Sequence, residues 1–83
     1  MDRELALKLH KIYLLEQDYK RAIYPEEIWA HGICGSSKIN DLIESLLNDY
    51  SIVEIAIRGA NAYKVTNIGR AHLESYLDIK REM

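Results

Sequence analysis

Residues 52–65 read IVEIAIRGANAYKV, and this stretch decides which fold the sequence predicts. Its first part, residues 52–57, is rich in β-branched residues and is typical of a strand. Glycine and asparagine within residues 58–61 indicate a hairpin tip, because both residue types tolerate the backbone angles of tight turns. Residues 62–65 then form the returning strand. The stretch therefore predicts a β-hairpin.

Residues 2–20 have the spacing of an amphipathic helix, with apolar side chains at steps of three and four. Leu7, Leu14 and Leu15 widen the apolar surface beyond a simple stripe, which suggests two packing partners for this helix, such as the core and a second subunit. After the helix, residues 21–24 favour a very short strand. The main stripe consists of Leu5, Leu9, Ile12, Tyr13, Glu16 and Tyr19, and all of them except Glu16 are expected on the buried face.

Two shorter helices are predicted between the short strand and the hairpin. Pro25 suits the first position of a helix over about 25–31, because its missing N–H group would have no partner there. Ser36 or Ser37 can cap the next helix, which continues to about residue 48.

A last helix is predicted after the hairpin, over about residues 67–82, with Thr66 as its cap. The order is then helix, short strand, helix, helix, strand, strand, helix, which is an α+β fold. The two short helices at about 25–48 form a helix-turn-helix unit, and the hairpin at about 52–65 follows it as a wing. We expect a single domain over residues 1–83.

The composition excludes two classes of protein. Of the 83 residues, 48% are hydrophobic and 29% are charged, with a formal net charge of −2. These values exclude a disordered chain, and they exclude a polycation that binds phosphate through bulk charge. The single cysteine, Cys34, permits no internal disulfide and favours an intracellular, cytoplasmic protein. Because Glu54 interrupts the longest apolar stretch, we expect no membrane span.

Residues 63–70 read YKVTNIGR and resemble the strand-to-helix junction of winged helix-turn-helix regulators, as found in the MarR, PadR and related archaeal branches. In this motif an aromatic and an aliphatic residue anchor the second wing strand. Thr66 caps the final helix, and Gly69 allows close packing at the start of that helix. Residues 36–47 resemble the recognition helix of the same superfamily.

The resemblance implies a transcriptional regulator that binds double-stranded DNA with a recognition helix at about 36–48 and a wing at about 57–64. Asparagine can pair with adenine, carboxylates can accept from cytosine, and serine hydroxyls can hold phosphates. Lys20 and Arg21 are a second candidate phosphate anchor. The same polar groups also suit a solvated surface without a ligand. The residues expected to contact DNA are Ser36, Ser37, Lys38, Asn40, Asp41, Arg58, Asn61 and Lys64.

The small size, together with surplus apolar residues on the first and last helices, predicts a homodimer through these two helices. The recognition helix departs from the pattern of the superfamily, because residues 36–50 hold one basic residue and three acidic ones. The alternative is therefore a protein-interaction winged helix, an adaptor or complex subunit with little DNA affinity. A second departure is Asp49 with Tyr50 where glycine is common, and we expect Asp49 to adopt the left-handed conformation of this turn.

The sequence holds no motif for catalysis or for a cofactor, so we expect a non-enzyme without cofactor or metal. His31 and Cys34 are three residues apart, but this single pair is a weak metal-binding pattern, and we expect a surface histidine near a helix end and a buried free thiol instead. Trp29 is expected to be the core anchor of its helix.

Overall fold

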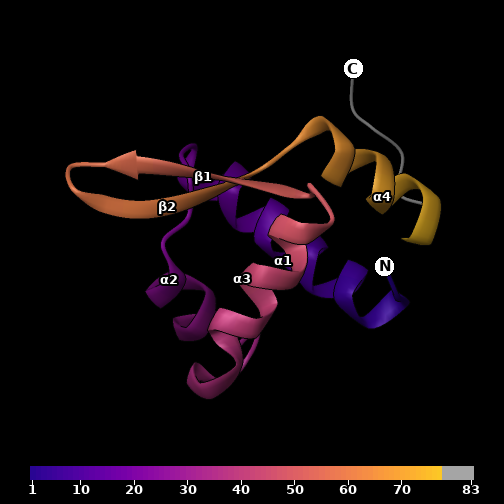
Figure 1. Ribbon diagram of the computed structural model, residues 1–83, viewed down its shortest axis with the longest axis horizontal. Helices are drawn as coiled ribbons and strands as arrows, with labels where there is room; N and C mark the ends of the chain where they lie inside the picture. Colours follow the sequence, from indigo (N-terminus) through magenta and orange to yellow (C-terminus); the bar gives the residue numbers. More distant parts are fainter. Residues whose placement is uncertain (78–83) are drawn as a thin grey trace.

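The computed structural model describes residues 1–77, which form an α+β fold of four α-helices and a two-stranded antiparallel hairpin (Figure 1). The predicted fold class is confirmed at this level. Residues 78–82, the end of the predicted last helix, lie outside the described residues. The elements in chain order are α1 (Arg3–Tyr19), α2 (Pro25–Ala30), a 3₁₀ turn η1 (Ser36–Lys38), α3 (Ile39–Asn48), β1 (Ile52–Ile57), β2 (Ala60–Val65) and α4 (Asn67–Leu77).

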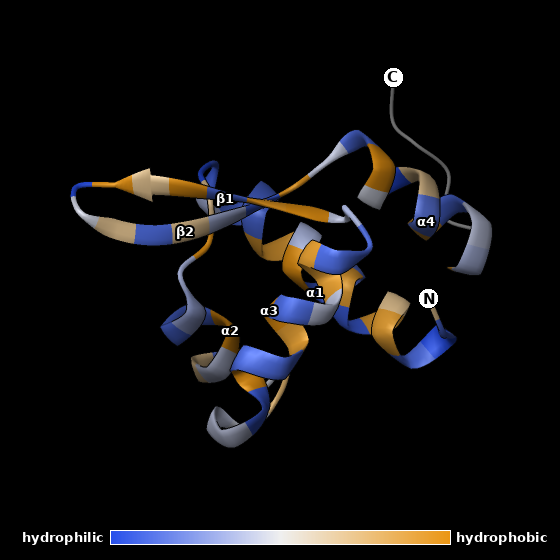
Figure 2. Ribbon diagram, viewed as in Figure 1, coloured by the Kyte–Doolittle hydropathy of each residue, from blue (hydrophilic) through white to orange (hydrophobic). Residues whose placement is uncertain are grey.

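The elements pack around one apolar cluster. α1 packs against α4 and β2, whereas α3 packs against α2 and β1. The hairpin extends past the helices, and its hydrophilic tip is free of them (Figures 1 and 2). None of the helices within residues 1–77 combines the length and the apolar character that a membrane crossing requires. The most completely buried large apolar side chains are Leu9, Ile12, Ile23, Ile28 and Leu46.

α1 is bounded by a side-chain cap at one end and a left-handed residue at the other. The Asp2 carboxylate accepts a hydrogen bond from the Leu5 N–H at 2.7 Å, which satisfies one of the free donors of the first turn. Lys20 ends the helix with φ = 57°, and its N–H donates to the Glu16 carbonyl. The predicted surplus of apolar surface is confirmed for Leu7 and Leu14, which are 43% and 49% exposed, whereas Leu15 is buried in the core.

The hairpin has a tighter tip than the predicted loop of residues 58–61. Arg58 and Gly59 both have positive φ, 52° and 81°, as the two-residue turns that match the twist of a hairpin require. The strands therefore pair up to Ala60, which lies opposite Ile57, and Asn61 also belongs to β2.

The outer edge of β2 is closed by two different groups. Ile23 forms an antiparallel bridge with Tyr63, with both N–H···O distances at 2.8 Å, and this bridge is the predicted short strand. The next hydrogen-bonded pair in this register would join Arg21 to Val65. Instead, the buried Glu16 carboxylate accepts from the Val65 N–H at 2.8 Å. The expectation that Glu16 lies off the buried face is wrong, because its carboxylate replaces a strand carbonyl.

Thr66 joins the hairpin to α4 as predicted. Its hydroxyl accepts from the Gly69 N–H at 2.9 Å and donates to the Tyr50 carbonyl at 2.6 Å, while its own N–H donates to the Ser51 carbonyl at 2.9 Å. The close approach expected at Gly69 is confirmed, because a Cβ there would lie 2.2 Å from the Ser51 carbonyl oxygen. This junction holds the start of α4 against the start of β1.

The turn after α3 differs from the expectation for Asp49. The left-handed residue is Tyr50, with φ = 58°, whereas Asp49 has φ = −85°. The Ser51 N–H donates to the Leu46 carbonyl and the Tyr50 N–H donates to the Leu47 carbonyl. These two bonds define a Schellman motif, whose left-handed position falls one residue later than we expected.

Two further expectations are wrong in this region. Trp29 is 54% exposed, and Ile28 is the buried residue of the six-residue helix α2, because so short a helix presents few positions to the core. Neither Ser36 nor Ser37 caps α3 through its side chain. The chain instead enters α3 through η1, where the Lys38 N–H donates to the Gly35 carbonyl.

Replacing Gly69 with alanine should destabilise the fold by about 1–3 kcal/mol, because the new methyl group would overlap the backbone of Ser51. Gly35→Ala is the matched control, since a Cβ at Gly35 meets no atom within 4 Å and φ there is −71°. Urea denaturation of the two variants measures the difference. Equal stability of both variants would contradict the close approach at Gly69.

Glu16→Ala should destabilise the fold by about 1–3 kcal/mol, because it leaves the buried Val65 N–H without an acceptor. Glu16→Gln retains a side-chain carbonyl and should lose less. Thermal unfolding measures stability, and amide hydrogen exchange at Val65 should accelerate only in Glu16→Ala. A loss in Glu16→Gln as large as that in Glu16→Ala would show that the accepted hydrogen bond is not the source of the effect.

Candidate nucleic-acid interface

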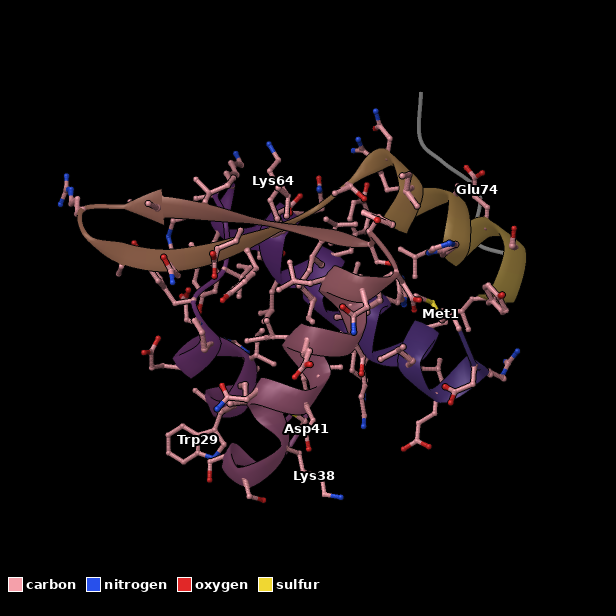
Figure 3. The ribbon with its side chains drawn as sticks, viewed as in Figure 1. Met1, Trp29, Lys38, Asp41, Lys64 and Glu74 are labelled. Carbon is pink, nitrogen blue, oxygen red and sulfur yellow. The ribbon has the colours of Figure 1, made fainter. Side chains whose placement is uncertain are left out.

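Most of the predicted DNA-contacting residues lie in η1, which holds Ser36, Ser37 and Lys38, and on the exposed side of the first turn of α3, which holds Asn40 and Asp41. α3 buries Leu42, Ile43 and Leu46, so the opposite side faces solvent. Figure 3 shows Lys38 and Asp41 at the amino end of α3, pointing away from the rest of the fold. The structure brings together five of the predicted residues here, all of them exposed: Ser36, Ser37, Lys38, Asn40 and Asp41.

The side chains of these residues have their polar groups available. Within the part of the chain that the structure describes, none of the five forms a side-chain hydrogen bond or ion pair with another residue. An external ligand can therefore contact them without displacing an internal partner.

Arg58 and Asn61 lie at the free end of the hairpin, and both are exposed. Arg58 occupies the first position of the two-residue turn, so its side chain begins at the tip of the hairpin. Side chains alternate between the two faces of a strand. Asn61 therefore shares a face of β2 with the core residues Tyr63 and Val65.

Lys64 does not join the other predicted residues. The same alternation places it on the opposite face of β2 from Tyr63, and Figure 3 shows it pointing away from α3. It lines a hollow of about 260 Å³ with Glu16, Gln17, Lys20 and Arg21. The prediction grouped Lys64 with Arg58 and Asn61 at the hairpin tip, and the structure places Lys64 on the other face of β2 from Asn61. The sequence contains a signal for this difference: side chains alternate between the two faces of β2, so Lys64, next to the core residue Tyr63, is expected on the opposite face.

The second predicted anchor, Lys20 with Arg21, thus gains Lys64 as a neighbour. Arg21 is already engaged, because its guanidinium group makes two hydrogen bonds to the Glu27 carboxylate, at 2.8 and 2.7 Å. It also lies 4.7 Å from the ring centre of Tyr19. Lys20 and Lys64 have no ion-pair partner among residues 1–77. They are the available cations of this hollow.

The charge of the α3 surface is unfavourable for phosphate. Its exposed face has Lys38 against Asp41 and Glu44, and Glu44 is also exposed. Trp29 is also exposed, on α2, the helix that packs against α3. Sequence reasoning missed this exposed indole, although the shortness of its helix was a signal that few of its side chains can reach the core.

Two other polar pairs, Ser51 with His72 and Tyr63 with Glu54, hold parts of the fold together. Ser51 Oγ and His72 Nδ1 are 2.8 Å apart, but Ser51 is fully buried and cannot reach a substrate. The hydroxyl group of Tyr63, on β2, donates a hydrogen bond to the Glu54 carboxylate, on β1, at 2.8 Å. Burial, and then this hydrogen bond, raises the pKa of Tyr63 to about 12, so the phenol stays protonated.

The weak metal-binding pattern is not assembled into a site. Nowhere in residues 1–77 do three or more His, Cys, Asp or Glu side chains gather closely enough to hold a metal ion. His31 Nε2 is 2.9 Å from the Tyr19 hydroxyl, and Cys34 is half-buried against the core. His31 is thus a surface histidine with a tyrosine partner.

Comparison of the chain with known protein families, curated proteins and solved structures gave no match. Two surfaces of the molecule are therefore the candidates for a function: the amino end of α3 with the hairpin tip, and the hollow around Lys64.

Acid should weaken the contribution of Glu27 to stability. The hydrogen bonds from Arg21 hold the pKa of Glu27 below its ordinary value of 4.5. A carboxylate with a lowered pKa stabilises the fold above its unfolded pKa, and this contribution is lost as the pH falls through the folded value. The stability difference between the wild type and Glu27→Gln should therefore shrink as the pH falls below 4.5. Urea titrations between neutral and acidic pH measure it, and a constant difference would contradict the ion pair.

Proposed function

We propose that the chain is a winged-helix DNA-binding protein that regulates transcription, with α3 as the recognition helix and the β1–β2 hairpin as the wing. The observation that carries the proposal is the set of exposed polar side chains at the amino end of α3, none of which has an internal partner. The hairpin, with Arg58 at its tip, extends past the helices and supplies a second contact.

The chemistry of these side chains suits DNA. The Asn40 side chain can pair with adenine, and the Asp41 carboxylate can accept from the amino group of cytosine in the major groove. Lys38 and the hydroxyl of Ser36 can hold backbone phosphates. Arg58 is suited to the minor groove or a phosphate beside it. Lys64 contributes nothing to this surface, since it faces the other way.

The charges make the expected binding weak. Each phosphate neutralised by a basic residue releases counterions and steepens the dependence of affinity on salt. Lys38 and Arg58 are the basic side chains of this surface, and Asp41 and Glu44 oppose them. We therefore expect modest affinity and a shallow salt dependence, with specificity from the base contacts of Asn40 and Asp41.

A second candidate function follows from Trp29. An indole that is 54% exposed, on a helix that packs against α3, also suits a protein partner, because tryptophan is enriched among residues that dominate binding energy. In this case the fold is an adaptor or complex subunit. A basic partner surface with an apolar pocket for the indole fits these residues.

Asn40→Ala should lose roughly tenfold or more in affinity for a duplex selected from a random pool, because it removes a base contact. Arg58→Ala should weaken binding by a smaller factor on all sequences, and it should reduce the salt slope by about 1. Fluorescence anisotropy of labelled duplexes at low salt measures both.

Lys64→Ala is the matched control, because it removes a lysine of the hairpin that faces away from α3. If it weakens binding as much as Arg58→Ala, DNA binds another surface than the one proposed. If no duplex binds at low salt and high protein concentration, the DNA proposal fails. Loss of a purified protein partner in Trp29→Ala, with binding kept in Asn40→Ala, would then support the adaptor.

A further inference from the structure

The side of α1 that faces away from the core carries a stripe that no residue in 1–77 covers. Its five members follow at steps of four, four, three and four, which places them on one face of the helix. This face lies opposite the buried Leu9, Ile12 and Glu16. We call it the outer stripe of α1, and its members, all exposed, are Arg3, Leu7, Lys11, Leu14 and Asp18.

The charges at the two ends of the outer stripe oppose the helix dipole. Arg3 lies in the first turn, where the positive end of the dipole favours an acidic residue, and Asp18 lies in the last turn, where a basic residue is favoured. Neither side chain has an ion-pair partner among the described residues. Within one copy of the chain both charges are therefore placed unfavourably.

We propose that the outer stripe is the contact surface for a second copy of this chain, with the two α1 helices antiparallel. In a two-fold arrangement, residue pairs whose numbers sum to 21 lie opposite one another. Leu7 then meets Leu14 of the second copy, and Arg3 meets Asp18 of the second copy. Because each helix end lies beside the opposite end of the other dipole, both unfavourable charges become favourable.

A hollow beside Leu14 supports this arrangement. It has a volume of about 190 Å³ and lies between α1 and the chain after α2. Leu7 of the second copy, opposite Leu14, is the apolar side chain that would enter it. The hollow is lined by Lys11, Leu14, Leu15, Asp18, His31 and Ile33.

The same geometry predicts a weak dimer. α1 has 17 residues, so its stripe is about 25 Å long and roughly 10 Å wide. This area is smaller than the roughly 800 Å² per partner of a standard interface. Lys11 also lies close to Lys11 of the second copy at the two-fold axis, and the like charges repel. Association should therefore depend strongly on protein concentration.

Charge reversal tests the pairing. Arg3→Glu and Asp18→Arg should each weaken the dimer by roughly tenfold, because each turns two symmetric attractions into repulsions. The double variant Arg3→Glu/Asp18→Arg should restore it. Sedimentation equilibrium over a wide concentration range, without DNA, measures the dissociation constant. Each reversal matches the helix dipole better than the native residue, so weaker association would not reflect a damaged fold.

Truncation separates α1 from α4 as the interface. Leu14→Ala should weaken the dimer, whereas Ile68→Ala should not, although Ile68 is equally exposed at 50%. A monomer at the highest concentration overturns the proposal. So does a double variant that fails to restore association, or a loss confined to Ile68→Ala. Because these measurements contain no DNA, they stand or fall separately from the proposed function.

Discussion

The hydrogen bond from the Val65 N–H to the Glu16 carboxylate is the contact on which the arrangement of helices and hairpin depends. β2 is bonded to β1 on one side and to Ile23 on the other, but the bridge at Ile23 covers only one residue pair. Val65 has no such strand partner on that side, because the segment before Ile23 turns into α1 at the left-handed residue Lys20. The Glu16 carboxylate of α1 accepts this hydrogen bond in place of a strand carbonyl. The buried Glu16 side chain thereby fixes α1 to β2, the strand that leads into α4.

Much of the fold could be predicted because its signals are local. The β-branched run of β1, Pro25 at the start of α2 and the Thr66 cap each determine the backbone around them, and all are observed. The roles of Glu16 and Trp29 could not be predicted in the same way. Whether a glutamate in an apolar stripe is buried depends on a donor 49 residues later, and whether an indole is buried depends on how few positions α2 presents to the core.

The candidate site was predicted in part for a related reason. Residues 36–41 are contiguous, so they lie close together even though they divide between η1 and the first turn of α3. Lys64 is only a few residues from the hairpin tip in sequence. A short distance along a strand, however, does not determine which face of the hairpin a side chain occupies. The structure therefore divides the basic residues between two surfaces and leaves the α3 surface with an excess of carboxylates.

The hairpin has two edges, and they differ in their exposure to other chains. Ile23 and Glu16 occupy the outer side of β2, whereas the outer side of β1 has no strand beside it within residues 1–77. An unpaired edge with the sequence IVEIAI is a template for strand addition between molecules. Glu54 is the single charged residue of β1, and it is exposed in the middle of that edge strand. Within residues 1–77, the charge that β1 itself sets against edge-to-edge association is therefore one carboxylate, which the Tyr63 hydroxyl of β2 holds at 2.8 Å.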